Sequence, residues 1–188
     1  SEFMPFIDLL SLGSELDKCL LATIKQKDIL ALTNQPIAIN LSQHSLQAPE
    51  FHQWLTTFLQ ESTHAQQMLF EIPESALINS FEHCQNIAEI VRAAGAKIGV
   101  DQCGRQIGSL DYLQKLQPHY IKLDQSFAFY EKVNQSNEMC RALINVAKGL
   151  NIDVVITGIE NQEQLQQFRS LRADGYQGYI SAPEDVLQ

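Results

Sequence analysis

The sequence lacks the paired cysteines and glycine-rich loops that identify several common classes of protein. Its four cysteines, Cys19, Cys84, Cys103 and Cys140, are widely separated and form no CxxC pair, which argues against a zinc ribbon and against a disulfide framework. No GxxxxGKS/T, GxGxxG or GxSxG motif occurs, so the nucleotide P-loop and the hydrolase nucleophile elbow are not supported. The five histidines show no HxH or HExxH spacing. We therefore expect reduced cysteines and no metal bound through histidine.

Positive charge is also scarce in this chain. Lysine and arginine number 13 against 22 aspartates and glutamates, and the net charge is −9. Binding to a nucleic-acid duplex depends on the neutralisation of many phosphates, so this balance argues against a nucleic-acid partner. A small phosphate ligand, held by one or two cations, remains compatible with the composition.

Long apolar runs are absent as well. No stretch approaches the roughly 20 apolar residues of a membrane span, and no secretory signal opens the chain, so we expect no direct membrane contact. The first residues, Ser1-Glu2-Phe3, include no initiator methionine. We expect a single domain over residues 1–188, cut from a longer protein whose upstream membrane or sensory segments are not included.

Runs of apolar residues recur about every 20 to 35 residues, which is the period of a βα unit. Six runs predict strands, at residues 37–41, 68–72, 97–101, 120–124, 153–157 and, more weakly, 173–180. Helical spacing of apolar residues predicts helices between them, at residues 15–32, 51–61, 80–94 and 137–150. In the first helix Leu16, Leu20 and Ile24 are expected on one face. Gly95, Gly149 and Gly175 are expected where helices stop.

Strands that are almost wholly apolar and alternate with helices indicate an α/β fold with a parallel sheet. We expect a (β/α)8 TIM-like barrel that is incomplete because its first strand is missing, with a doubly wound open sheet as the alternative. A barrel explains the polar groups at many strand ends, because that face carries its site, whereas an open sheet has its site at a switch point between strands. The two open edges, near Ile37 and Gly178, would then be completed by another chain or by segments that are not included.

Polar residues stand at the ends of three predicted strands. Asn40, Glu71 and Asp101 each follow an apolar run, and Glu is almost never fully buried without a partner. Asn40 alone fits a structural cap equally well. Together the three offer an oxygen-only half-shell of the kind that Mg²⁺ or Mn²⁺ prefers.

Two cationic residues lie close to these strand ends in the sequence. Lys122 alternates with apolar residues and precedes Asp124, which fits either an internal ion pair with Asp101 or Asp124, or a cation over a phosphate oxygen. Arg105 lies in the loop after Asp101, where it can reach a phosphate or remain solvated.

Eight motifs in order resemble the EAL domain, the (β/α)8-barrel phosphodiesterase fold for cyclic di-GMP. The resemblance runs from about residue 1 to residue 183. The matches, with the family motif second, are SEFMP at 1–5 with PxEFIP, INLS at 39–42 with VNLS, EIPE at 71–74 with EITE, DQCG at 101–104 with DDFG, SLDYL at 109–113 with SSLxYL, IKLDQSF at 121–127 with KIDxSF, TGIE at 157–160 with EGVE, and QGY at 177–179 with QGY.

Two departures from the family pattern bear on activity. Gln102 replaces the second aspartate of DDFG, and Thr157 replaces the first glutamate of EGVE. The resemblance implies that active members use these positions around two metal ions, which stabilise the attacking and leaving oxygens of the displacement. The loss of two negative charges predicts weak binding of the second cation. The strand with the Glu-Ala-Leu signature is also missing, so we expect no enzyme activity.

The remaining family positions imply a binding role. The resemblance gives a set of ligand-binding residues: Asn40, Glu71, Asp101, Arg105, Lys122, Asp124, Glu160 and Gln177. DQCGRQ and TGIE are most similar to the LapD-type receptors, in which the domain lies in the cytoplasm behind sensory and degenerate GGDEF segments of an inner-membrane protein.

We accordingly expect a catalytically inactive cyclic di-GMP receptor domain. Its partners would be the dinucleotide and either a second copy of the domain or other domains of the parent protein. No cofactor is expected beyond residual Mg²⁺ binding. The alternatives are a protein-interaction module that binds no nucleotide and an active metal-dependent phosphodiesterase.

Overall fold

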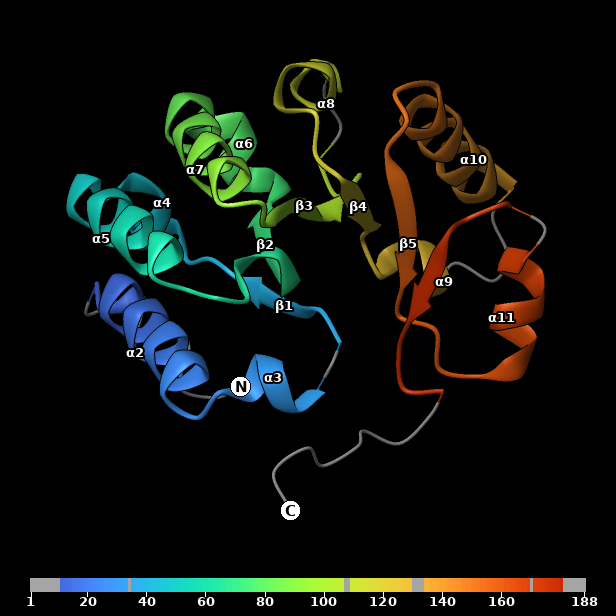
Figure 1. Cartoon of the computed structure of the whole chain (residues 1–188). Helices are drawn as coiled ribbons and strands as arrows, with labels where there is room; N and C mark the ends of the chain where they lie inside the picture. The colour runs from blue at the N-terminus through green and yellow to red at the C-terminus, as the bar shows by residue number, and fades with distance from the viewer. Residues whose placement is uncertain (1–10, 34, 107–108, 130–133, 170, 181–188) are drawn as a thin grey trace. The chain divides into compact units, whose positions relative to one another are not determined.

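The computed structural model describes residues 11–33, 35–106, 109–129, 134–169 and 171–180 (Figure 1). In this part of the chain six strands form a parallel sheet whose order follows the sequence: β1 (Ile37–Asn40), β2 (Met68–Pro73), β3 (Lys97–Cys103), β4 (Tyr120–Leu123), β5 (Asp153–Thr157) and β6 (Gly175–Gln177). The order never reverses, whereas a doubly wound sheet requires a reversal. The α/β class and the strand order of a TIM-like barrel, with fewer than its eight strands, are therefore confirmed.

The chain divides into two compact units between Ile98 and Gly99. In the first unit β1 pairs with β2 in an unbroken parallel register from Ile37–Met68 to Asn40–Glu71. Its helices are α2 (Gly13–Gln26), α3 (Ile29–Thr33), α4 (Gln43–Gln47), α5 (Pro49–Gln60), the 3-10 turn η1 (Ala65–Gln67), α6 (Glu74–Asn79) and α7 (Phe81–Ala93). Helix α5 packs against α7, and α2 packs against α4.

The long first helix predicted from the sequence is wrong in two respects. Asp28 adopts a left-handed backbone conformation with φ of 49°, which ends α2 and separates it from α3. The buried face of α2 contains Asp17, Leu21 and Ile24, whereas Leu20 is 46% exposed. The buried face differs because the carboxylate of Asp17 finds hydrogen-bond donors in the chain that follows β1.

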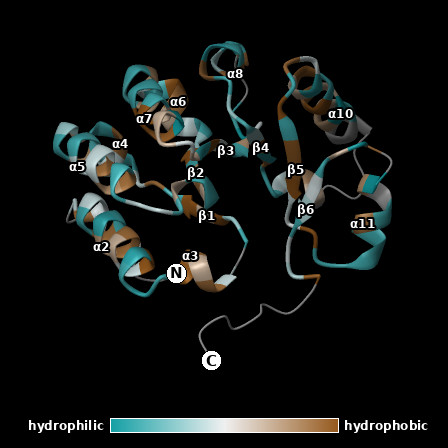
Figure 2. Cartoon of the chain, in the orientation of Figure 1, coloured by the Kyte–Doolittle hydropathy of each residue, from teal (hydrophilic) through white to brown (hydrophobic). Residues whose placement is uncertain are grey.

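In the second unit β4 pairs with β5 from Tyr120–Asp153 to Leu123–Ile156, and β5 pairs with β6 from Val155–Gly175 to Thr157–Gln177. The helices are α8 (Asp111–Leu116), α9 (Ser126–Phe129), α10 (Asn134–Gly149) and α11 (Gln162–Arg169). Helix α10 packs against β5. Figure 2 shows β5 as hydrophobic over much of its length, while the helices carry both hydrophobic and hydrophilic residues, as expected for helices that cover a sheet.

Helix ends agree only partly with the glycines in the sequence. Gly95 follows α7 with φ of 76°, as predicted. After α10 the residue with a left-handed backbone conformation is Asn151 and not Gly149. Between α11 and β6 the left-handed residue is Arg172, and Gly175 is part of β6. Asparagine tolerates this conformation better than most residues, so glycine is a reliable but incomplete signal.

All four cysteines lie in the described part of the chain and are free thiols, as expected. Burial raises the pKa of Cys84 to about 12 and that of Cys140 to about 11. Both thiols therefore stay protonated at neutral pH and act as apolar core residues.

No helix in the described ranges is long and apolar enough to cross a bilayer.

Candidate functional site

Two of the predicted ligand-binding residues lie in the first unit. Asn40 ends β1 and is exposed, and its register partner in β2 is Glu71, which is fully buried. The backbone N–H of Leu41 donates to the carbonyl of Glu71 at 3.0 Å, so the parallel ladder continues past Asn40. The structure thus brings Asn40 and Glu71 together at neighbouring strand ends, as the sequence predicted.

A buried carboxylate holds the chain just after Asn40. The Oδ2 atom of Asp17 accepts hydrogen bonds from the backbone N–H of Ser42 at 2.8 Å and from the hydroxyl of Ser45 at 2.7 Å. Ser42 in turn caps α4, because its Oγ accepts from the backbone N–H of Ser45 at 3.2 Å. Asp17 was missed in the sequence, although an acidic residue one turn before Leu21 and close to Ile24 was an available signal.

The remaining six predicted site residues, Asp101, Arg105, Lys122, Asp124, Glu160 and Gln177, lie in the second unit. Here β3 does not end at Asp101 as predicted but continues to Cys103. Val100 pairs with Ile121 and Cys103 with Leu123, so β3 has one extra residue and forms a bulge. Within the bulge Gln102 has φ of 57° and is exposed. A bulge at this point redirects the side chains at the end of the strand.

Lys122 and Asp124 differ in their surroundings. Lys122 is half-buried in β4, while Asp124 is 8% exposed and begins the turn into α9. The Oδ1 atom of Asp124 accepts from the backbone N–H of Ser126 at 2.9 Å, and its own N–H donates to the carbonyl of Cys103 at 3.0 Å. Asp124 therefore links the ends of β3 and β4 and caps the turn, a structural role that the sequence left open.

Thr157 has a structural partner of its own at the end of β5. Its hydroxyl donates to the carbonyl of Leu123 at 2.6 Å, which adds a side-chain bond across the strand pair β4–β5. A glutamate at this position could not make the same bond when ionised, because a carboxylate has no proton to donate. The replacement of an acid by threonine therefore changes both the charge and the hydrogen bonding of this strand end.

Glu160 and Gln177 are both exposed; Glu160 lies three residues after β5, and Gln177 is the last residue of β6. The buried side chain of Gln164 fixes the backbone at Glu160. Its Oε1 accepts from the N–H of Glu160 at 2.7 Å, and its Nε2 donates to the carbonyl of Ala128 at 3.4 Å. Gln164 thereby ties the segment after β5 to α9. A single glutamine in α11 gives no sequence signal for this role.

The segment after β6 approaches the segment after β5 very closely. The N–H of Ile159 donates to the carbonyl of Gln177 at 3.1 Å, and a Cβ atom added to Gly178 would lie 1.9 Å from the carbonyl oxygen of Ile159. Only glycine fits such an approach. This contact holds Gln177 next to the Thr157–Glu160 segment.

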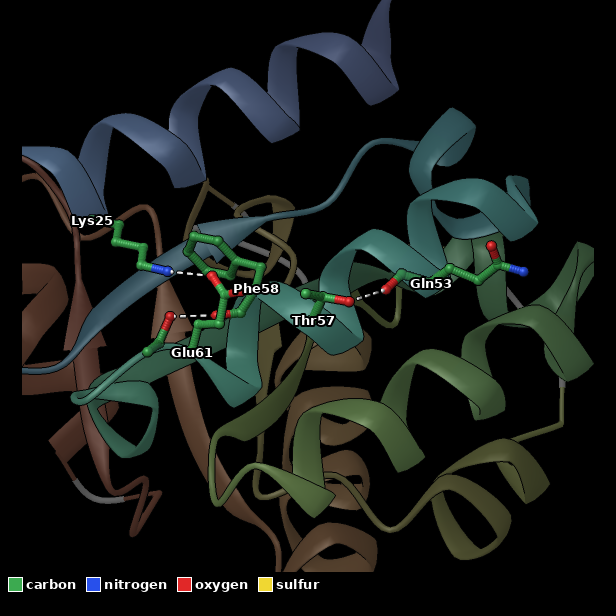
Figure 3. A network of polar contacts seen from close by, with 6 residues as sticks. Lys25, Gln53, Thr57, Phe58 and Glu61 are labelled. Carbon is green, nitrogen blue, oxygen red and sulfur yellow. Dashed lines mark hydrogen bonds and ion pairs between the residues drawn. The ribbon is translucent and has the colours of Figure 1, made fainter.

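A separate polar network lies at the other end of β2 and serves helix packing (Figure 3). Lys25 forms an ion pair with Glu61 at 2.9 Å and lies 5.6 Å from the ring centre of Phe58. Lys25 and Glu61 border a hollow of about 90 Å³ that is also lined by Met68, the first residue of β2. Both charged groups are well exposed, so the pair contributes about 0–1 kcal/mol to stability.

The three residues of the predicted oxygen half-shell for Mg²⁺ or Mn²⁺ fall in different parts of the chain. Asn40 and Glu71 lie in one unit and Asp101, which is half-buried, lies in the other. Within the described ranges no three His, Cys, Asp or Glu side chains are grouped so that they could hold a metal ion. At the two positions that the family resemblance links to a second metal ion, Gln102 offers a neutral amide, and Thr157 donates its hydroxyl proton to the carbonyl of Leu123.

Comparison with known proteins identifies the family. The EAL domain matches residues 1–184, which is more than half of the chain, so the chain belongs to the EAL domain family. The SEFMP motif at its start lies outside the described residues. Two relatives from Escherichia coli K12 are a probable cyclic di-GMP phosphodiesterase, PdeI, and the RNase E specificity factor CsrD. PdeI is 27% identical over 76% of this chain and 18% of its own length, and CsrD is 24% identical over 100% of this chain and 29% of its own length.

Among solved structures the chain is similar to the S helix-GGDEF-EAL portion of LapD from Vibrio cholerae. The apo form matches with a TM-score of 0.88 at 28% identity, over 92% of this chain and 43% of that chain. The form bound to cyclic di-GMP matches with a TM-score of 0.87 at the same identity and coverage. The predicted resemblance to LapD-type receptors is confirmed at the level of the fold. The chain spans less than a third of the relatives PdeI and CsrD.

Proposed function

We propose that this EAL domain binds cyclic di-GMP without hydrolysing it and acts as the receptor module of a longer signalling protein. The observation that supports this most directly is the state of the two replaced positions. Thr157 uses its hydroxyl to bond the carbonyl of Leu123, and Gln102 offers only a neutral amide. A site that must place two divalent cations needs carboxylates there. The second unit has instead used these positions for internal hydrogen bonds.

The binding residues in this proposal are those at the strand ends. Asn40 and Glu71 end the register of β1 and β2, and Asp101, Lys122, Glu160 and Gln177 occupy the corresponding segments of the second unit. Lys122 and Arg105 supply positive charge for phosphate oxygens, while amide and carboxylate oxygens accept hydrogen bonds from guanine N–H groups. Asp124 contributes by holding the turn at the end of β4. The fold similarity to LapD bound to cyclic di-GMP supports the choice of ligand.

The architecture of the parent protein belongs to the same proposal. The matched LapD structures contain an S helix and a GGDEF domain before the EAL domain. We place the present domain in the cytoplasm, after comparable segments of an inner-membrane protein. Its partners would be those segments or a second copy of the domain, which would read the ligand-bound state.

The proposal is tested on the full-length protein with two measurements. Titration calorimetry with cyclic di-GMP measures binding, and chromatography of the nucleotide after incubation with Mg²⁺ or Mn²⁺ measures the linear product. We expect binding with no product above a control without protein. Linear product at a higher rate would show an active phosphodiesterase, and the absence of any binding would favour a protein-interaction module that binds no nucleotide.

A matched variant makes the test sharper. Gln102→Asp combined with Thr157→Glu restores both carboxylates while leaving Asn40, Glu71 and Asp101 in place. If the lost carboxylates cause the inactivity, the double variant gains hydrolysis in Mn²⁺ and each single variant gains less. Hydrolysis by the unchanged protein at the rate of the double variant would contradict the proposed cause.

A further inference from the structure

The bulge at the end of β3 brings two side chains into direct contact. The Oε1 atom of Gln102 accepts a hydrogen bond from Nη1 of Arg105 at 2.9 Å. The backbone carbonyl of Gln102 also accepts from the N–H of Arg105, at 3.4 Å. The left-handed conformation of Gln102 makes both contacts possible, since it turns the chain back on itself within three residues. Arg105 is thus held by one residue at both its backbone and its side chain.

The backbone of the loop at Gly104, which connects Gln102 to Arg105, is closely packed against its neighbours. Gly104 has φ of 86°, and an added Cβ atom would lie 2.7 Å from Cδ1 of Leu143 and 2.8 Å from the ring of Phe127. The carbonyl of Cys103 accepts from the N–H of Asp124 at 3.0 Å, which fixes the loop to the end of β4. The guanidinium of Arg105 therefore projects from a well-supported backbone even though its side chain is exposed.

The neutral charge of Gln102 decides what this guanidinium is able to do. A carboxylate partner would compensate the positive charge of the guanidinium, whereas an amide oxygen orients the guanidinium and leaves its positive charge uncompensated. Of the five N–H donors of arginine, one is used by Gln102. The other N–H donors include the pairs whose geometry matches the two oxygens of a phosphate group.

We propose that Gln102 and Arg105 form a phosphate clamp that binds the phosphodiester of the ligand without a metal ion. The clamp rests on the proposed function. It gives Gln102, which stands where the family has an aspartate, a role in binding the ligand. In this arrangement the oriented guanidinium supplies, within the second unit, positive charge for an anionic phosphate oxygen. Lys122, half-buried in β4, is the second cation of the same unit that the proposed site contains.

The test uses calorimetric titration of the full-length protein with cyclic di-GMP, in EDTA and separately in Mg²⁺. The unchanged protein is expected to bind equally well in both buffers. Arg105→Ala should weaken binding about 10- to 100-fold in both, the range expected for the loss of charge-assisted hydrogen bonds. Arg169→Ala, at the exposed end of α11, is the matched control and should bind like the unchanged protein.

Gln102→Asp separates the clamp from a merely structural role. The new carboxylate neutralises Arg105 and repels phosphate, so binding in EDTA should fall by roughly tenfold or more. Mg²⁺ should restore part of this loss, because the carboxylate now attracts a cation, and should have no effect on the unchanged protein. Circular dichroism confirms that each variant is folded.

Three results would overturn the clamp. Binding by Arg105→Ala at the affinity of Arg169→Ala would remove the clamp and leave the proposed function standing. Binding by the unchanged protein only in Mg²⁺ would show that a metal, and not Arg105, neutralises the phosphate. The absence of binding in both buffers would refute the proposed function and the clamp together.

Discussion

The two units stabilise their strand ends by different means. In the first unit a buried carboxylate, Asp17, reaches from α2 to hold the chain after Asn40 through two hydrogen bonds. In the second unit the carboxylate of Asp124 caps the turn after β4, and neutral groups hold the ends of β5 and β6: the hydroxyl of Thr157, the amide of Gln164 and the close approach at Gly178. The positions that the family uses for acids are neutral only in the second unit. At one of these positions, Thr157, the neutral side chain forms a hydrogen bond within the unit, to the carbonyl of Leu123.

The largest effect is expected for Gly178→Ala in the second unit. The added Cβ would lie 1.9 Å from the carbonyl oxygen of Ile159, so the segments after β5 and β6 must separate. We expect a loss of roughly 3 kcal/mol in the free energy of unfolding, measured by urea denaturation. Gly149→Ala is the control, because nothing lies within 4 Å of its added Cβ, and it should be neutral or slightly stabilising. Equal losses in both variants would show that the close approach is not a stabilising feature.

A somewhat smaller effect is expected for Asp17→Ala in the first unit. The change leaves the N–H of Ser42 and the hydroxyl of Ser45 without their acceptor and should cost about 2 kcal/mol. Because Ser42 follows Asn40 by two residues, the affinity for cyclic di-GMP should fall as well. Glu15→Ala, an exposed change on the same helix, should alter neither quantity. A variant with lower stability and unchanged affinity would confine Asp17 to a role in folding.

Thr157→Val should have a moderate effect on the second unit. Valine has nearly the shape of threonine but cannot donate to the carbonyl of Leu123, and the expected loss is about 1 kcal/mol. The control is Thr57→Val on the exposed side of α5, where the hydroxyl donates to the carbonyl of Gln53 at 3.3 Å (Figure 3). Its expected effect is within about 0.5 kcal/mol. A loss for Thr157→Val as small as the control's would contradict the importance of this hydrogen bond.

The smallest effect concerns an ion pair at the start of β5. Burial alone raises the pKa of Asp174, but hydrogen bonds from Lys148 and from the N–H of Val154 outweigh it, and the net pKa is lowered. A lowered pKa means that Asp174 stabilises the fold at neutral pH and that this contribution is lost as the pH falls through the folded-state value, below about 4. Lys148→Met should therefore be less stable than the unchanged protein at neutral pH and lose this difference in acid. Because Asp174 is more than a third exposed, the difference should be small and reduced by salt.

Most strands were predictable because they are short, largely apolar runs, and all six overlap the predicted segments, although β3 extends two residues further and β6 is shorter than predicted. The short helices α4, α6, α8, α9 and α11 were not predicted, since four to eight residues are too few to show clear helical periodicity. The break at Asp28 and the bulge at Gln102 were missed for a related reason. Both depend on a left-handed residue that is not glycine, and nothing local in the sequence marks such a residue.

The pairing of Asn40 with Glu71 was predicted, whereas the residues that support the strand ends were not. Asn40 and Glu71 fall in register as expected, because the ends of adjacent parallel strands meet at one edge of a sheet. Gln164 and Gly178 were not predicted, since their roles come from backbone atoms of segments that are distant in the sequence. Asp124 was predicted as a ligand residue, and its carboxylate accepts from the N–H of Ser126. Its place among the ligand contacts remains a prediction.

The aromatic residues are distributed so that each unit has its own fluorescence signal. Trp54, the single tryptophan, stacks on Phe58 with ring centres 5.1 Å apart, and it lies in the first unit. All five tyrosines lie after Gly99 and therefore in the second unit. Selective excitation of tryptophan reports the melting of the first unit alone, while tyrosine emission reports the second. One unlabelled sample can thus reveal whether the two units unfold as a single cooperative body or one after the other.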